Sequence, residues 1–231
     1  MNQPNPFNQS NTTAQAGIIT SQYSGGALKV LKNTYALLAL TLAFSGLTAF
    51  VSMSMNMPPL NPFITLIGYF GLLFAVHKTC QSALGLVFIF ALTGFMGLTL
   101  GPILSMYTAT SNGSELVMLA LGGTATIFFG LSAFTLITKR DFSNIGKALF
   151  VGLLVAFVAA IANIFLQIPA LALTVSSLFI LLSSGVILYQ TSEIIHGGET
   201  NYIRATITLY VSLYNIFLSL LHLLTAFGGD D

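Results

Sequence analysis

Four polar side chains in the last fifth of the chain have the types and the spacing of a site for an ion or a proton. Gln190 and Glu193 are separated by one helical turn, as are Ser212 and Asn215, so each pair shares a face of a helix. Arg204 stands between the two pairs and is a candidate ion-pair partner for Glu193. Such oxygen-bearing groups can bind a cation or relay a proton, but they can equally join two helices by hydrogen bonds. Both interpretations stay open.

Motifs of enzyme chemistry are absent from the sequence. It has no H-E-x-x-H, G-x-S-x-G or Walker motif, and Gly197-Gly198 follows no strand that would make it a phosphate-binding loop. The single cysteine, Cys80, excludes an internal disulfide and a zinc site of several thiolates. We therefore expect no enzyme, no cofactor and no resident metal. His77 and His196 remain candidate pH sensors, although a loop histidine is more often merely solvated.

The composition shows which elements must position these groups. Only 6% of the 231 residues are charged, whereas 55% are hydrophobic. A soluble domain carries about 25% charged residues, so a water-facing surface cannot be built from this chain. The composition excludes a soluble enzyme, a disordered chain and a nucleic-acid-binding protein, and it indicates a protein of the lipid bilayer.

Long apolar runs predict an all-α membrane protein with seven transmembrane helices. A bilayer core of about 30 Å needs about 20 helical residues. Proline-containing breaks at 56–62 and 167–169 divide the two longest uncharged intervals. The predicted spans are about 33–55, 62–79, 83–105, 115–138, 146–167, 170–195 and 202–226.

The basic residues predict the orientation. All seven fall in the segment before the first span, in the loops on that same side or at the adjoining helix ends: Lys29, Lys32, Lys78, Lys139, Arg140, Lys147 and Arg204. The positive-inside rule therefore places the N-terminus in the cytoplasm and the C-terminus outside. Residues 1–28 are polar and uncharged before Lys29, which predicts a flexible cytoplasmic tail ahead of the seven-helix domain at 29–231.

Small residues recur at helical spacing in several spans, as expected for close helix packing in lipid. Gly97 and Gly101 form a G-x-x-x-G pattern in the third span, and Pro102 is expected to bend or end that span.

Two stretches carry a resemblance to a known family. Gly97 through Leu104 includes Gly101 and Pro102, and Ala120 through Phe128 includes Thr124 and Ala125. Together they resemble the signature of the Bax-inhibitor (TMBIM) family. The segments from Ile187 to Ser192 and from His196 to Ile203 look most like its bacterial YccA branch, and the similarity runs from about residue 29 to 227.

The resemblance implies a seven-helix bundle of the Bax-inhibitor type in the bacterial inner membrane. It also implies a partner, the membrane-anchored ATP-dependent protease FtsH, which members of this branch bind and modulate and which degrades them from the cytoplasmic tail. An accessible polar tail suits that role. The expected function is therefore a modulator of an FtsH-type protease complex that is also its substrate.

Other members of the family are calcium-leak proteins with two aspartates between the last two helices. The matching positions here are Gln190 and Ser212, which are neutral and cannot share a proton or supply paired charge to calcium. Glu193, one turn from Gln190, is a partial substitute by helical spacing alone. A calcium or pH-sensitive cation leak is thus the alternative function, ahead of a small-solute transporter, for which no repeat or broken helix is evident.

Overall fold

A computed structural model describes the backbone of residues 6–228 and the side chains of residues 25–228. Every regular element in this part of the chain is helical, and seven helices are long and apolar enough to cross a membrane. This confirms the predicted fold class. The helices are α1 Pro6–Ser54, α2 Pro62–Thr79, α3 Ala83–Thr108, α4 Gly113–Thr138, α5 Gly146–Leu166, α6 Pro169–His196 and α7 Tyr202–Gly228, with a short 3-10 helix, η1, at Ser143–Ile145.

Local sequence signals set the ends of several helices. Pro62 is the first residue of α2, and the Asn61 side chain caps this helix by accepting the Phe63 N–H at 2.9 Å. Gln167 ends α5 with a left-handed backbone at φ 52°, and Pro169 then opens α6. Gly197 ends α6 at φ 80°, a conformation that glycine adopts without steric cost. The breaks expected at 56–62 and 167–169 are therefore present.

Two helices are longer than the sequence predicts. Helix α3 passes through Pro102 and continues to Thr108, so the proline does not end the span. The backbone of α1 is helical from Pro6, and no proline interrupts the chain between Pro6 and Ser54. Residues 1–5, and the side chains before Gly25, lie outside the described part of the chain. The flexibility expected of the 1–28 tail stays a prediction.

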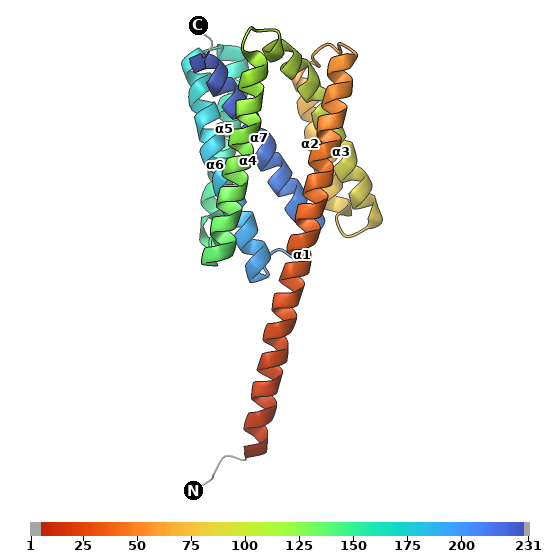
Figure 1. The fold of residues 1–231 in the computed structure, drawn as a ribbon, viewed down its shortest axis with the longest axis vertical. Helices are drawn as coiled ribbons and strands as arrows, with labels where there is room; N and C mark the ends of the chain where they lie inside the picture. Colours follow the sequence, from red (N-terminus) through yellow and green to blue (C-terminus); the bar gives the residue numbers. More distant parts are fainter. Residues whose placement is uncertain (1–5, 229–231) are drawn as a thin grey trace.

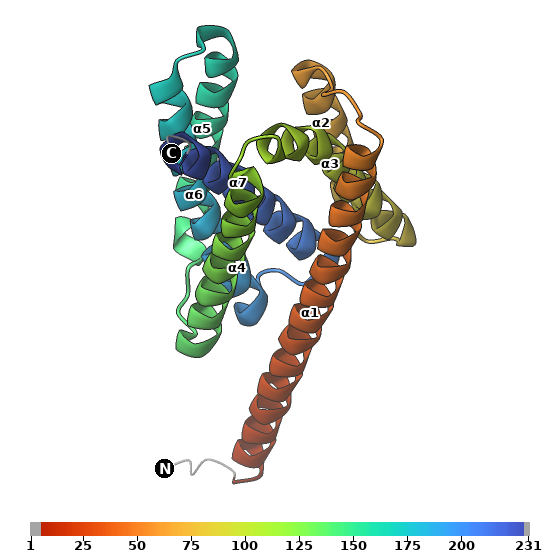
Figure 2. The ribbon, with the colours of Figure 1, turned by 45° about the horizontal axis from the view of Figure 1, so that its top comes forward.

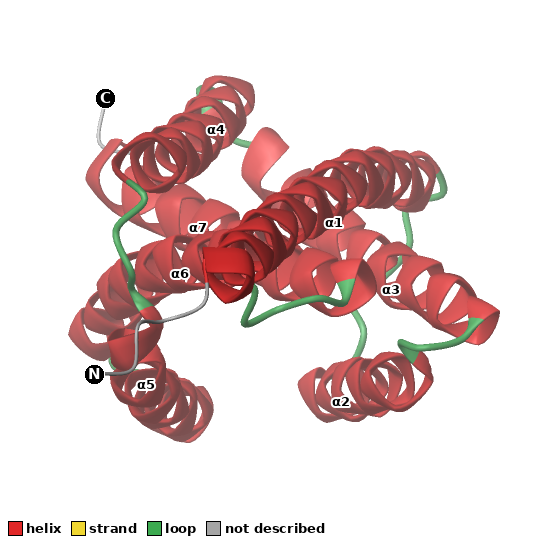
Figure 3. Ribbon diagram, turned by 90° about the horizontal axis from the view of Figure 1, so that it is seen from below, coloured by secondary structure: helices red, strands yellow, loops and turns green. Residues whose placement is uncertain are grey.

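Helix α7 is the centre of the bundle. It packs against α1, α3, α4 and α6, whereas α2 lies on α3 and α5 lies on α6 at the periphery (Figure 3). Half of the residues in an 18-residue apolar stretch of α7 are buried inside the bundle. In the corresponding stretches of α2 and of segment 143–166, which contains α5, only 6% are buried. Since lipid is as apolar as a leucine side chain, the peripheral helices can expose large hydrophobic residues such as Ile67 and Phe150 without penalty.

The helices run alternately up and down, so the loops gather at two ends (Figure 1). One end carries Lys32, Lys78, Lys139, Arg140 and Arg204, and we name it the basic end. Helix α1 extends beyond the bundle at this end, while α7 ends at the opposite one (Figure 1).

Candidate functional site

Gln190 and Ser212 are both buried in the interior of the bundle. Gln190 on α6 is 5% exposed, and Ser212 on α7 is 4% exposed. The Ser212 hydroxyl donates to the Thr208 carbonyl of its own helix at 2.9 Å, whereas the Gln190 Nε2 is buried without a hydrogen-bond partner. No hydrogen bond joins these two side chains in the described structure. Asn215, one turn along α7, is half-buried. Gln190 and Ser212 are thus interior groups, but they do not form a closed cluster.

More buried polar atoms without a partner lie on helices near Gln190, towards the basic end. A buried donor that has exchanged water for no protein partner is costly, so such atoms mark places where water or a ligand would be stabilised. These atoms are Oγ1 of Thr34 and OH of Tyr35 on α1, Oγ of Ser132 on α4 and Oγ1 of Thr191 on α6.

Glu193 does not pair with Arg204, which corrects the expectation from sequence. The Arg204 Nε lies 3.7 Å from Oε2 of Glu199, and this is the ion pair found among residues 25–228. The Glu193 carboxylate instead lies over Gly198, where an added Cβ would collide with it. The left-handed turn at Gly197 folds the loop back so that the Glu199 N–H reaches the Glu193 carbonyl at 3.1 Å. This fold brings Glu199, rather than Glu193, to Arg204.

Asn201 organises the basic end, and reasoning from sequence missed it. Its Oδ1 accepts the N–H groups of Ile203 and Arg204 and so caps α7. Its Nδ2 donates to the Cys80 carbonyl at 2.8 Å, 121 residues away in sequence. Asn201 therefore ties the start of α7 to the end of α2. The local signal was an asparagine just before an apolar helix, but the second contact depends on the tertiary fold.

The loop between α4 and α5 is held by α6. Ser192 accepts the Phe142 N–H at 2.9 Å and lies 3.3 Å from the Arg140 carbonyl. In this loop the pKa of the exposed Asp141 carboxyl is lowered, chiefly because the Ser143 backbone N–H donates to it at 2.8 Å and, to a smaller extent, because the Ser143 hydroxyl and His196 favour its charged form.

The glycines of the third span form a close seam between α3 and α1. A Cβ at Gly97 would collide with Thr48 Oγ1 and the Ser45 carbonyl, and one at Gly101 would meet the Ser52 side chain at 2.5 Å. Pro102 has no N–H for the Leu98 carbonyl, and the Ser52 hydroxyl donates to that carbonyl at 2.9 Å. The seam therefore explains both the glycines and the tolerance of proline inside α3.

The second motif stretch lies on α4. Ala120, Thr124 and Phe128 are buried at intervals of four residues, whereas Ala125 is exposed. Ala120 packs with Phe217 of α7 in an interior cluster. The α4 motif is thus a packing stripe against the central helix.

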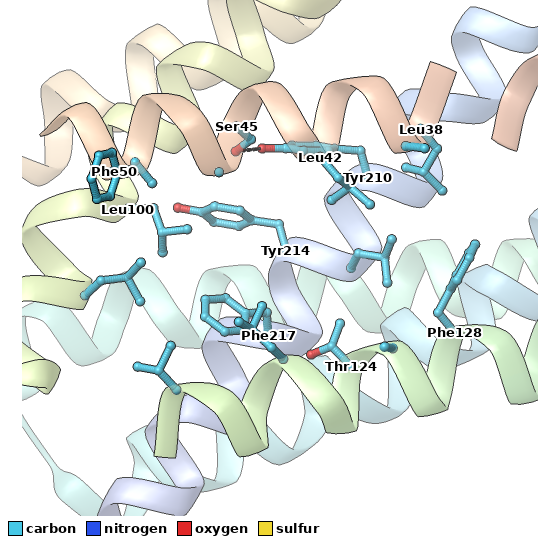
Figure 4. Close-up of a pocket in the computed structure, with 18 of the residues that line it drawn as sticks. Leu38, Leu42, Ser45, Phe50, Leu100, Thr124, Phe128, Tyr210, Tyr214 and Phe217 are labelled. Atoms are coloured by element: carbon cyan, nitrogen blue, oxygen red, sulfur yellow. Dashed lines mark hydrogen bonds between the residues drawn. The ribbon is translucent and has the colours of Figure 1, made fainter. Parts of the chain in front are cut away.

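A cavity of about 580 Å³ lies between α1 and α4, with α7 behind it (Figure 4). Its lining is apolar apart from a few hydroxyls, and it includes Thr124 and Phe128 of the α4 motif. At its base the hydroxyls of Ser45 and Tyr210 are hydrogen-bonded at 2.7 Å. The cavity contains none of the sequence-predicted polar residues Gln190, Glu193, Arg204, Ser212 and Asn215.

The family model described as "Inhibitor of apoptosis-promoting Bax1" matches residues 27–229, which is nearly the whole chain. The chain belongs to the Bax-inhibitor family. The seven-helix bundle, the α1–α3 seam and the α4 stripe are therefore features of a Bax-inhibitor protein, as the sequence motifs predicted.

Three bacterial relatives match this chain over most of their own length. The "Modulator of FtsH protease YccA" of Escherichia coli K12 is 54% identical over 203 residues, covering 88% of this chain and 92% of the relative. An uncharacterized protein of Pseudomonas aeruginosa is 55% identical over 202 residues, covering 87% and 91%. The "Inner membrane protein YccA" of E. coli O6:H1 matches at 54% over 203 residues, covering 88% and 92%.

These findings place the chain as a multi-pass protein of the inner membrane. Seven apolar helices agree with the name of the E. coli O6:H1 relative, an inner membrane protein. The names of the family and of the two E. coli relatives describe an inhibitor, a modulator and a membrane protein, and none of them describes an enzyme.

Proposed function

We propose that this protein binds and modulates an FtsH-type membrane protease and is also degraded by it. One observation carries the proposal: the match to a protein named as a modulator of FtsH covers almost all of both chains at 54% identity. The match to the family model, at residues 27–229, spans the helix seams and the basic-end loops.

The proposed orientation puts the basic end in the cytoplasm. Support comes from the positive-inside rule, because the loops at this end carry the lysines and arginines. Helix α1 extends past the bundle at the same end (Figure 1). The N-terminal segment would thus be presented away from the bilayer, where a processive ATP-dependent protease can engage it.

Affinity capture from gently solubilised membranes tests the binding. The tagged full-length protein is expected to co-purify with the protease complex. A matched control is another multi-pass inner-membrane protein with the same tag at equal expression. Recovery of the protease at the level of that control would refute the proposal.

The lifetime of the protein tests the degradation. Removal of residues 2–28 is expected to lengthen the half-life in cells that contain the protease, because the accessible starting segment is lost. A tail of the same length and composition in shuffled order should leave the half-life unchanged. Equal half-lives for the intact and the truncated protein would contradict degradation from the tail.

The alternative is a cation pathway between α6 and α7. The observation that favours it is the buried, unpartnered amide of Gln190, with further unpartnered hydroxyls on neighbouring helices. Flux into liposomes loaded with a calcium indicator tests this alternative. We expect little flux from the natural sequence and more from the double variant Gln190→Asp with Ser212→Asp, since paired carboxylates attract a divalent cation. Strong pH-dependent flux from the unmodified protein would favour the pathway over the modulator.

A further inference from the structure

We propose that the cavity between α1 and α4 holds an acyl chain of a phospholipid from the leaflet at the basic end, with its phosphate beside Lys32. The proposal does not depend on the protease. It rests on the shape of the cavity, its opening, its chemistry and the position of one lysine.

The cavity opens sideways between two helices of the membrane-spanning bundle. Leu42 of α1 and Leu121 of α4 both line it, yet they are 40% and 55% exposed. Helices α1 and α4 stand apart at this place, and α7 crosses behind them (Figure 2). Because these helices cross the bilayer, the exposed side of the cavity meets hydrocarbon chains rather than water.

The cavity has the length of a hydrocarbon chain. On α1 the lining residues extend from Tyr35 to Met53, a rise of about 27 Å, and on α4 from Val117 to Phe129, about 18 Å. The stretch that both helices line, about 18 Å, is longer than the roughly 15 Å that one leaflet contributes to the core. An acyl chain of one leaflet therefore fits along it.

The lining offers contacts for an apolar group and few for a polar one. No charged residue contributes to the cavity. The Ser45 and Tyr210 hydroxyls bond each other, and the Thr124 hydroxyl donates to the Ala120 carbonyl at 2.7 Å. These three hydroxyls are already paired, whereas the Tyr35 hydroxyl, on another lining residue, has no partner. An alkyl chain leaves the paired hydroxyls satisfied, and each buried methylene contributes to binding.

Lys32 supplies a charge at the mouth of the cavity. The cavity-lining positions of α1 follow one another at intervals of three or four residues from Tyr35 onward, and Lys32 continues this face one turn towards the basic end. Its side chain is exposed, and it has no carboxylate partner among residues 25–228. An ammonium group at the membrane surface attracts an anionic lipid phosphate.

Two glycines provide a matched pair of variants. Gly46 of α1 lines the cavity, whereas Gly71 of α2 does not. Both lie inside helices, and at both an added Cβ would meet no atom within 4 Å. Gly46→Phe therefore fills the cavity, and Gly71→Phe makes the same chemical change on a lipid-facing surface elsewhere.

The first measurement is the amount of phospholipid that stays bound to the purified full-length protein during washing with detergent, read by native mass spectrometry. The wild type and Gly71→Phe should retain phospholipid, and Gly46→Phe should retain about tenfold less, the loss expected when about two methylenes lose their contacts. Lys32→Gln should also lower retention, whereas Lys147→Gln on α5 should not. Equal retention in Gly46→Phe and Gly71→Phe overturns the proposal. The proposal is also overturned if Gly46→Phe loses a bound polypeptide or a second copy of the chain, and not phospholipid.

A second measurement does not rely on lipid surviving purification. The chain has no tryptophan, so Phe217→Trp places a single indole in the wall that α7 contributes to the cavity. In bilayers of phospholipid with brominated acyl chains, this fluorescence should be strongly quenched. Quenching should disappear when Gly46→Phe is added and persist when Gly71→Phe is added. An unquenched indole in the otherwise natural sequence would refute the proposal.

Discussion

The hydroxyl of Ser52 on α1 donates to the carbonyl of Leu98 on α3 at 2.9 Å, and it replaces the hydrogen bond that Pro102 cannot make. Gly101 permits this contact, because any side chain there would displace Ser52. In lipid no water is present to satisfy the freed carbonyl, so the serine and the proline act as a pair.

Removing the Ser52 hydroxyl should destabilise the protein. Ser52→Ala leaves the Leu98 carbonyl unpaired, with an expected cost of about 0.5–2 kcal/mol. Ser54→Ala is the matched control, since its exposed hydroxyl bonds only the Phe50 carbonyl of its own helix. Unfolding in detergent measures both variants. The cost of Ser52→Ala should shrink in a Pro102→Ala background, where the helix regains its own donor, and an unchanged cost there would contradict this pairing.

The α1–α3 seam should reject even one methyl group. Gly97→Ala drives a Cβ into the Ser45 carbonyl, and we expect a loss of about 1–3 kcal/mol because the two helices must separate. Gly122→Ala meets open space and should be neutral or slightly stabilising, by up to about 1 kcal/mol, from helix propensity. Thermal unfolding of the two variants makes the comparison. Equal stabilities would show that the helices do not pack as closely as described.

The ion pair at the basic end should couple Arg204 to Glu199 and not to Glu193. The pair is partly exposed, with Arg204 at 44% and Glu199 at 13%. A double-mutant cycle with Arg204→Gln and Glu199→Gln should therefore give only about 0.2–1 kcal/mol of coupling. The parallel cycle with Glu193→Gln should give a value near zero. Larger coupling in the second cycle would restore the pairing that the sequence predicted.

Asp141 should titrate below its ordinary value of 3.8. A lowered pKa means that this carboxylate contributes stability above pH 3.8 and loses it as the pH falls through the pKa of the folded state. NMR titration of the carboxyl carbon gives the pKa directly. Ser143→Ala should keep most of the shift, because the main cause is the backbone N–H of residue 143. A pKa at or above 3.8 would contradict the contact.

Single cysteines should report the orientation of the bundle. In a Cys80→Ser background, Ser114→Cys lies at the start of α4 and Asn144→Cys lies in η1 at the basic end. Both native side chains are exposed. An impermeable maleimide added to cells with a permeabilised outer membrane should label residue 114 only, and residue 144 after the inner membrane is opened. The reverse pattern would overturn the proposed cytoplasmic N-terminus.

Much of the fold was predictable because its signals are local. The length of an apolar run and the breaks at Pro62 and Pro169 depend on neighbouring residues, so the seven helices could be predicted from them. The path through Pro102 was not predictable in this way. Whether a proline ends a helix in lipid depends on which group donates a hydrogen bond to the freed carbonyl. Here the donor is the Ser52 hydroxyl, 46 positions away from Leu98.

The candidate site was less predictable than the helices. Helical spacing puts Gln190 and Glu193 on one face, and Ser212 and Asn215 on one face. It cannot say that the Gln190 amide lacks a partner while Ser212 bonds its own helix. It also favoured Glu193 for Arg204, because the turn at Gly197 that presents Glu199 is a matter of loop geometry.

By itself the sequence determined a membrane protein of seven helices, because scarcity of charge and length of apolar run are properties of the chain in any conformation. It also determined the family, through motif stretches that the Bax-inhibitor family model matches. Only the tertiary structure decided the seam at Ser52 and Pro102, the Arg204–Glu199 pair and the cavity between α1 and α4. The seam and the cavity depend on how distant helices approach or stand apart, and the ion pair depends on how the loop turns at Gly197. Side-chain periodicity along a single helix contains no information about either.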